Sequence, residues 1–156
     1  MSQPDRDAGT PSSDTAPAEI ATHDEMVVGF NAELGFRLTE WRQDYARLEL
    51  TVAPKHLNRS GIVHGGVLAT LIDAAGGYTG VWQPDPAADM IRAVTLSLTT
   101  SFVGQSRSGR LIATAHRKGG GKRIFFATGE VHDEAGTLLA FGEATYRVRG
   151  TVSGPD

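Results

Sequence analysis

A chain of 156 residues suits one domain, with a core large enough to be stable alone or in a small oligomer. Its formal net charge of −3 provides no overall field for holding nucleic acid, so we expect no nucleic-acid partner. Cysteine is absent, which excludes disulfides, thiolate catalysis and zinc–cysteine sites.

The first 22 residues are rich in Ser, Thr, Pro, Asp and Ala and nearly free of large apolar side chains. Such a segment cannot offset the entropy of ordering, so we predict a flexible tail over residues 1–22. The folded domain is expected over 23–150, with a second tail at 151–156. Because no apolar run approaches the ~20 residues that cross a bilayer, we expect a cytoplasmic protein without a membrane partner.

The first predicted element is a short helix, in which apolar residues at helical spacing begin after Asp24 as N-cap and end at Gly35 as C-cap. Two extended segments follow at 36–40 and 46–53, and Pro54 ends the second. The only long helix is predicted over 65–81, before the prolines at positions 84 and 86.

The C-terminal half is rich in alternating and β-branched residues, which predict four strands, at 94–103, 110–117, 123–133 and 137–149. The sequences SRSG, KGGGK and DEAG between them are turn-like, so hairpins between consecutive strands are expected. One long helix among antiparallel strands predicts an α+β architecture, in which the apolar face of the sheet wraps around the helix.

The strongest chemical signal is His64-Gly65-Gly66, followed by Asp73 nine positions after the histidine. Two glycines at a helix start expose N–H groups that favour negative charge on a ligand oxygen. Asp73 lies about two and a half turns further along the helix. An oxyanion stabiliser and a base or nucleophile are what acyl transfer requires.

Asp73 has Ala69, Gly76 and Gly77 as its helical neighbours, so its face of the helix carries little bulk. Such a face lets a ligand or another backbone approach closely, and the carboxylate would look into that gap. A solvated aspartate on an ordinary helix face fits the periodicity equally well. The adjacent glycine pair favours the functional interpretation.

Two polar residues ahead of the helix are further candidates. Asn58 lies in a loop, where its amide could hold water or a carbonyl, although a turn-forming role is the commoner one. The imidazole of His64 suits proton transfer, but a histidine just before a helix more often fixes the loop through hydrogen bonds. The other histidines lack metal-ligand spacing, so we predict no metal.

The segment Lys118-Gly119-Gly120-Gly121-Lys122-Arg123, which Arg117 precedes, is a tight turn with four cations. It lacks the P-loop pattern and no helix follows it, so nucleotide hydrolysis does not follow. A contact with phosphate and a solvated hairpin with charged flanks are both compatible with this composition.

The run NRSGIVHGGVLATLIDAAGG resembles the signature of hotdog-fold acyl-CoA thioesterases, and most closely the phenylacetyl-CoA and 4-hydroxybenzoyl-CoA thioesterase-like group. The resemblance extends over about 27–148 and includes the ending GTLLAFGEATYRV. It implies a sheet wrapped around a central helix, dimers joined through their sheets and often paired into homotetramers, and active sites shared between subunits.

The resemblance also implies roles for individual residues. Asp73 would be the catalytic carboxylate, as general base or nucleophile, and the Gly65 N–H would bind the thioester oxygen. Asn58 would lie near the carbonyl or water, and Thr95 would help to position water. Residues of the cationic turn would contact coenzyme A phosphates: Lys118, Gly119, Lys122 and Arg123.

The prediction is therefore an acyl-CoA thioesterase that needs no cofactor beyond the coenzyme A of its substrate. A hotdog hydratase or dehydratase is the alternative enzyme, with His56 or His64 as the only histidines able to serve. A non-catalytic acyl-CoA binding protein is the other alternative. The sequence leaves the acyl group open, because four aromatic residues could line a pocket or belong to the core: Tyr78, Trp82, Phe102 and Phe125.

Overall fold

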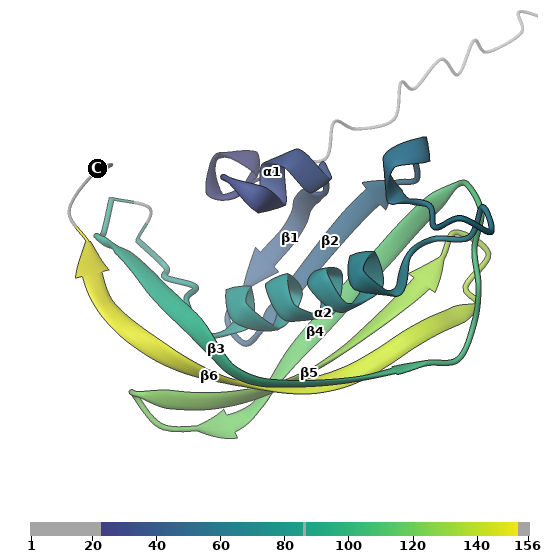
Figure 1. The fold of residues 1–156 in the computed structure, drawn as a ribbon. Coiled ribbons are helices and arrows are strands. Elements are labelled where there is room, and N and C mark those ends of the chain that lie inside the picture. Colours follow the sequence, from purple (N-terminus) through teal and green to yellow (C-terminus); the bar gives the residue numbers. More distant parts are fainter. Residues whose placement is uncertain (1–22, 86, 153–156) are drawn as a thin grey trace, which may run out of the picture.

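A six-stranded antiparallel sheet curves around one long helix, α2 (Figure 1). The computed structural model describes residues 23–85 and 87–152. The strands are β1 (Arg37–Arg42), β2 (Tyr45–Thr51), β3 (Met90–Phe102), β4 (Arg110–Gly120), β5 (Ile124–Asp133) and β6 (Leu138–Val152). The helices are η1 (Asp24–Met26), α1 (Phe30–Leu34), η2 (Pro54–His56) and α2 (Gly65–Thr79). The strand order is β1-β2-β4-β5-β6-β3, so the α+β prediction is confirmed.

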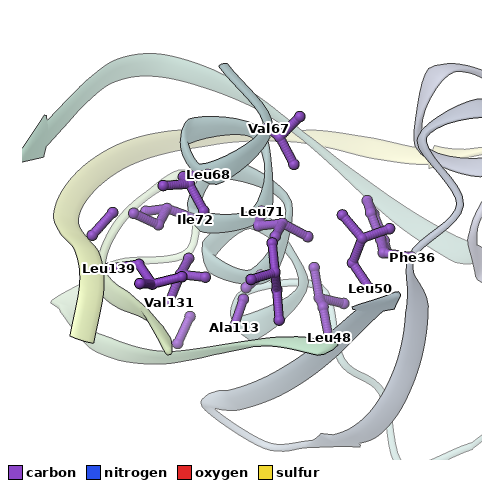
Figure 2. Packing of buried hydrophobic residues seen from close by; sticks show 14 of the residues in the cluster. Phe36, Leu48, Leu50, Val67, Leu68, Leu71, Ile72, Ala113, Val131 and Leu139 are labelled. Carbon is purple, nitrogen blue, oxygen red and sulfur yellow. The ribbon is translucent and has the colours of Figure 1, made fainter. Parts of the chain in front are cut away.

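The core lies between α2 and the concave face of the sheet (Figure 2). The helix contributes Leu68, Leu71, Ile72 and Ala75, whose helical spacing places them on one buried stripe. The sheet contributes side chains from alternate positions of its strands: Leu48, Leu50, Ala113, Val131 and Leu139. Burial of this apolar surface holds the helix on the sheet and therefore fixes the height and rotation of every other residue of α2.

Two aromatic rings of the sheet approach the C-terminal half of α2 closely. A Cβ on Gly76 would lie 2.2 Å from the hydroxyl oxygen of Tyr146, and a Cβ on Gly80 would lie 2.2 Å from the Phe125 ring. Both rings are buried, with Phe125 fully inaccessible. The small-residue face of the helix is thus filled partly by the protein's own sheet, and only the part around Gly77 stays open.

The hairpin prediction is right for two of the three turns and wrong for the third. β4 pairs with β5 and β5 with β6, as the turns KGGGK and DEAG indicate. β3 instead pairs with β6 at the edge of the sheet, so the SRSG segment crosses two strands to reach β4. A turn sequence predicts only that the chain changes direction. The pairing partner of β3 is decided by the long antiparallel ladder that it forms with β6.

The predicted N-terminal helix is broken into two short pieces, η1 and α1. Gly29 interrupts it with φ of 59°, a left-handed conformation that no helix continues through. His23, not Asp24, occupies the N-cap position, and the Asp24 carboxylate pairs with Arg37 instead. Gly35 is the left-handed C-cap, as predicted.

The strand β6 continues to Val152, two residues beyond the predicted end of the domain. The predicted tail at 1–22 and the last four residues lie outside the described part of the chain. None of the helices in the described ranges is long and apolar enough to cross a membrane.

The contact between Gly80 and Phe125 makes a stability prediction. Gly80→Ala should destabilise the protein by about 1–3 kcal/mol, because the new methyl overlaps a ring that has nowhere to move. Gly77→Ala is the matched control: its Cβ would lie 3.6 Å from Tyr146, and it should be neutral or stabilising by about 0.5–1 kcal/mol. Urea unfolding measures both. Equal stability of the two variants would contradict the packing.

Candidate active site

Asp73 and Thr95 form a hydrogen-bonded pair at the middle of α2. The Thr95 hydroxyl donates to Oδ1 of Asp73 over 2.7 Å. Both residues line a cavity of about 320 Å³, together with Gly77, Tyr78 and Tyr146. Asp73 is partly buried, so its side chain lines the cavity and is still partly exposed to solvent. The structure brings together the predicted carboxylate and hydroxyl, which are 22 residues apart in the chain.

A β-bulge presents Thr95 to the helix. Thr95 pairs with Tyr146 and Ser97 pairs with Thr145, so Leu96 is an extra residue between two ladder positions. In a regular strand, Thr95 and Ser97 would share a face. The bulge places Thr95 on the helix side instead, where its hydroxyl reaches the carboxylate.

Tyr146, on β6, holds the backbone of Asp73 from the sheet side. This residue was not predicted from the sequence. Its hydroxyl donates to the backbone carbonyl of Asp73 over 2.9 Å, and its ring stacks on Phe125 with centroids 4.9 Å apart. Burial raises the pKa of Tyr146 far above its ordinary value, and the charge of Asp73 raises it further. The phenol therefore stays protonated and remains a donor. The glycine pair Gly76-Gly77 was the available signal, because it leaves room for a large ring.

His64 is the N-cap of α2. Its Nδ1 accepts a hydrogen bond from the Gly66 N–H over 2.8 Å, in agreement with the loop-fixing role. A Cβ on Gly66 would lie 2.9 Å from that same Nδ1. The second glycine of the motif therefore makes room for the imidazole, and the imidazole satisfies one of the free N–H groups of the helix.

Gly65 is the first residue of α2, so its N–H has no acceptor within the helix. The Phe102 ring lies beside it, and both residues line a separate cavity of about 300 Å³ at the start of α2, with Val63 and Leu68. Gly65 and Asp73 are separated by about 12 Å along the helix axis, at 1.5 Å per residue. A donor and a base that act on one thioester group must each lie about 3 Å from it. One chain does not bring these two groups to one carbonyl.

Asn58 forms the loop ahead of α2. Its Oδ1 accepts from the N–H groups of Ser60 and Ile62, at 2.9 and 3.2 Å. This is the turn-forming arrangement that the loop sequence favours. Among the described residues, no group accepts a hydrogen bond from its amide nitrogen, so a contact with substrate would depend on Nδ2.

The cationic turn joins β4 to β5. Arg117 is held within the protein: it donates to the Gly121 carbonyl over 3.1 Å and lies over the Phe125 ring. In the described part of the chain, the side chains of Lys118, Lys122 and Arg123 form no ion pair. Lys118 lines a hollow on the outer face of the sheet, with Ser97 and Glu143, and not the cavity of Asp73. The turn and Asp73 therefore belong to different surfaces of one chain.

The two histidines considered for the hydratase alternative, His56 and His64, have different environments. His56 is buried; its Nδ1 accepts from the Ala53 N–H and its Nε2 contacts the Leu34 carbonyl, at 2.9 and 2.8 Å. Both ring nitrogens of His56 are thus engaged within the protein, whereas His64 uses only Nδ1 in the cap and is exposed, so the hydratase alternative would depend on the Nε2 of His64. No cluster within the described residues has three or more groups able to hold a metal ion.

The aromatic residues that the sequence left open have separate places. Phe125 belongs to the core, and Phe102 lies beside Gly65. Tyr78 lines the cavity of Asp73, and Trp82 lines an adjoining cavity near the end of α2.

The chain belongs to the thioesterase superfamily, whose family model matches residues 60–140. The matched segment contains the His-Gly-Gly motif, all of α2 and the strand that carries Thr95. The predicted hotdog fold and the predicted class, a thioester hydrolase, are both confirmed.

The chain is similar to several individual members. The Mycobacterium tuberculosis protein Rv1847 is 30% identical over 118 residues, which are 76% of this chain and 84% of that protein. Its solved structure has a TM-score of 0.69 at 27% identity, and covers 83% of this chain and 100% of that one. The medium/long-chain acyl-CoA thioesterase YigI of Escherichia coli is 26% identical over 131 residues, with 76% of this chain and 84% of YigI covered.

The two roles of Asn58 can be separated by substitution. Asn58→Asp keeps the oxygen that closes the loop and removes the Nδ2 donor, whereas Asn58→Ala removes both. If Nδ2 orients the carbonyl or water, both variants lose kcat, and only the alanine variant also loses thermal stability. Steady-state kinetics and thermal unfolding measure the two effects. Full kcat in a folded Asn58→Asp protein would leave Asn58 as a turn residue only.

Proposed function

We propose that this protein hydrolyses acyl-CoA to a carboxylic acid and free coenzyme A, with Asp73 as the catalytic carboxylate. The observation that carries the proposal is the Asp73–Thr95 pair, which lines a cavity beside α2. This helix lies within the segment that matches the thioesterase superfamily. The name of YigI, an acyl-CoA thioesterase, supports the choice of substrate. A cytoplasmic location stays a prediction, made from a sequence in which no apolar run approaches the length that crosses a bilayer.

Thr95 fixes the carboxylate in one orientation by donating to Oδ1, which leaves Oδ2 for the reaction. As a general base, Oδ2 takes a proton from water while the water oxygen bonds to the thioester carbon. The C–S bond then breaks, and coenzyme A leaves as a thiolate that takes up a proton. As a nucleophile, Oδ2 would itself bond to that carbon and form an anhydride, which water hydrolyses. Both routes need a donor for the developing oxyanion.

We infer that this donor is the Gly65 N–H of a second subunit. Within one chain the two groups are too far apart along α2, so a complete site requires another copy. The edge strand β3 offers the surface: it is 13 residues long, pairs only with β6 among the described strands, and has exposed apolar side chains at Leu96, Leu98 and Phe102. An unpaired edge of this length favours pairing with another chain. A homodimer, or a tetramer made of two dimers, follows.

The coenzyme A phosphates are assigned to the cationic turn. Lys118, Lys122 and Arg123 carry charges that the described residues leave unpaired, and the Gly119–Gly121 backbone allows close approach. Because this turn and Asp73 lie on different surfaces of one chain, it too would serve the Asp73 of another subunit.

Asp73→Asn tests the catalytic role. The amide keeps the shape of the side chain and can still accept from Thr95, so folding should be unchanged. Loss of the base or nucleophile should lower kcat by about 10²–10⁴. Release of free thiol from a panel of acyl-CoA substrates is the measurement. Wild-type turnover of every active substrate by the folded variant would refute the assignment, and an inactive wild type that binds acyl-CoA would indicate the binding protein instead.

Gly65→Pro removes the proposed oxyanion donor alone. Proline suits the first helical position, and His64 already has the extended backbone that a following proline requires. We expect kcat to fall by about 10²–10³. Gly65→Ala is the matched control, because it adds a Cβ beside Phe102 but keeps the N–H, and it should retain most activity.

A mixture of Gly65→Pro and Asp73→Asn chains tests the shared site. In a mixed dimer, the intact Gly65 of one chain would meet the intact Asp73 of the other, so one of the two sites regains wild-type activity. If both groups of a site come from one chain, no mixed dimer can recover. Absence of recovery after proven subunit exchange would therefore contradict the division.

A further inference from the structure

A second cavity, of about 460 Å³, lies next to the cavity of Asp73. Its walls come from η1, β1 and the segment that connects the end of α2 to β3. Three residues line both cavities: Met26, Val81 and Met90. The two cavities therefore adjoin at these three side chains, and a flexible group attached to a carbonyl at Asp73 would pass beside them to reach the second cavity.

The lining of the second cavity is mostly apolar, and the polar tip of its Trp41 ring is bonded within the protein. Trp41 donates its Nε1–H to the Tyr78 carbonyl over 2.9 Å, and Tyr78, which lines the neighbouring cavity of Asp73, donates its hydroxyl to the Met26 carbonyl over 2.9 Å. Both polar tips are thus satisfied within the protein, which leaves ring faces and apolar side chains for an occupant. Two methionines at the junction can adapt to a chain that bends.

The polar residues of this cavity disfavour a negatively charged occupant. Glu25 and Asp85 belong to its lining, and no lysine or arginine is among the described residues that line it. His23 also lines the cavity, but its Nδ1 already lies 3.9 Å from the Glu25 carboxylate, so a carboxylate at the far end of an acyl group would meet two acidic residues and lose its water there. The occupant that fits is uncharged and apolar.

We propose that this cavity holds the distal part of a medium- or long-chain alkyl acyl group, and that it sets the preference of the enzyme for long thioesters. The inference rests on the proposed thioesterase function and adds its substrate class. A short or compact aromatic acyl group would fill only the space beside Asp73 and Gly77. A long alkyl chain fills both spaces, and each methylene buried in the transition state raises kcat/KM about fourfold.

Ala88→Phe tests the proposal by filling the second cavity without touching the first. Ala88 is exposed on a connecting loop and lines only the second cavity, so folding should tolerate the change. Ala87→Phe is the matched control, because Ala87 is next to Ala88 in the chain but lines neither cavity. We expect wild-type kcat/KM to rise with acyl length, and Ala88→Phe to lose at least tenfold on long-chain substrates while short-chain turnover stays unchanged.

Intrinsic fluorescence provides a second readout that does not depend on turnover. The chain contains two tryptophans, Trp41 and Trp82, and both line this cavity. An acyl-CoA with bromine at the end of a long chain should quench them in the Asp73→Asn protein, and a short brominated analogue or a long chain that ends in a carboxylate should not. The Ala88→Phe change should abolish the quenching, and Ala87→Phe should not.

The outcomes separate the inference from the function on which it rests. If acyl-CoA substrates are hydrolysed without dependence on length and no quenching occurs, the cavity does not hold the chain and the inference is wrong. If long chains quench the tryptophans but no thioester is hydrolysed, the cavity assignment stands and the catalytic proposal fails. Equal effects of the Ala87 and Ala88 substitutions would also overturn the inference.

Discussion

The close seating of α2 on the curved sheet is the constraint on which the rest of the structure depends. Apolar burial at Leu71 and Ile72 holds the helix down, and it succeeds only because Gly76 and Gly80 make room for the rings beneath them. Tyr146 then adds a directional contact, since its hydroxyl reaches the Asp73 carbonyl. Packing and one hydrogen bond together set the position of the carboxylate, so the accuracy of the site derives from the core and not from the loops around it.

The length of α2 is the reason for proposing that one chain carries two incomplete sites. A straight helix presents Gly65 at its start and Asp73 beyond its second turn, and nothing in a rigid rod can shorten that interval. The helix therefore offers a donor at one end and a carboxylate at its middle, each with its own cavity. Assembly about the free edge of β3 is the economical way for such a helix to supply both groups to one substrate.

Local signals could be predicted from the sequence where one segment determines the outcome. The start of α2, its apolar stripe and the exposure of Asp73 to a face of small residues all follow from residues within a few turns of one another. Thr95 depends on a bulge, and Tyr146 reaches Asp73 across 73 positions. The SRSG segment misleads for the same reason, because the partner of β3 is chosen by a distant strand. The N-terminal helix is broken by the left-handed backbone of Gly29, which the spacing of apolar residues does not predict.

The cap at the start of α2 also limits how the His-Gly-Gly motif can change over evolutionary time. The capping imidazole of His64 needs a residue without a side chain two positions later, at Gly66, and among the described residues a Cβ on Gly66 would crowd nothing but that imidazole. A lineage can therefore exchange the cap first and relax the second glycine afterwards, but not in the reverse order. The first glycine, Gly65, is constrained differently, by the Phe102 ring beside it and by the substrate oxygen that we propose its N–H binds. The three residues of the motif are therefore subject to two independent constraints: the helix cap acts on His64 and Gly66, and the proposed chemistry acts on Gly65.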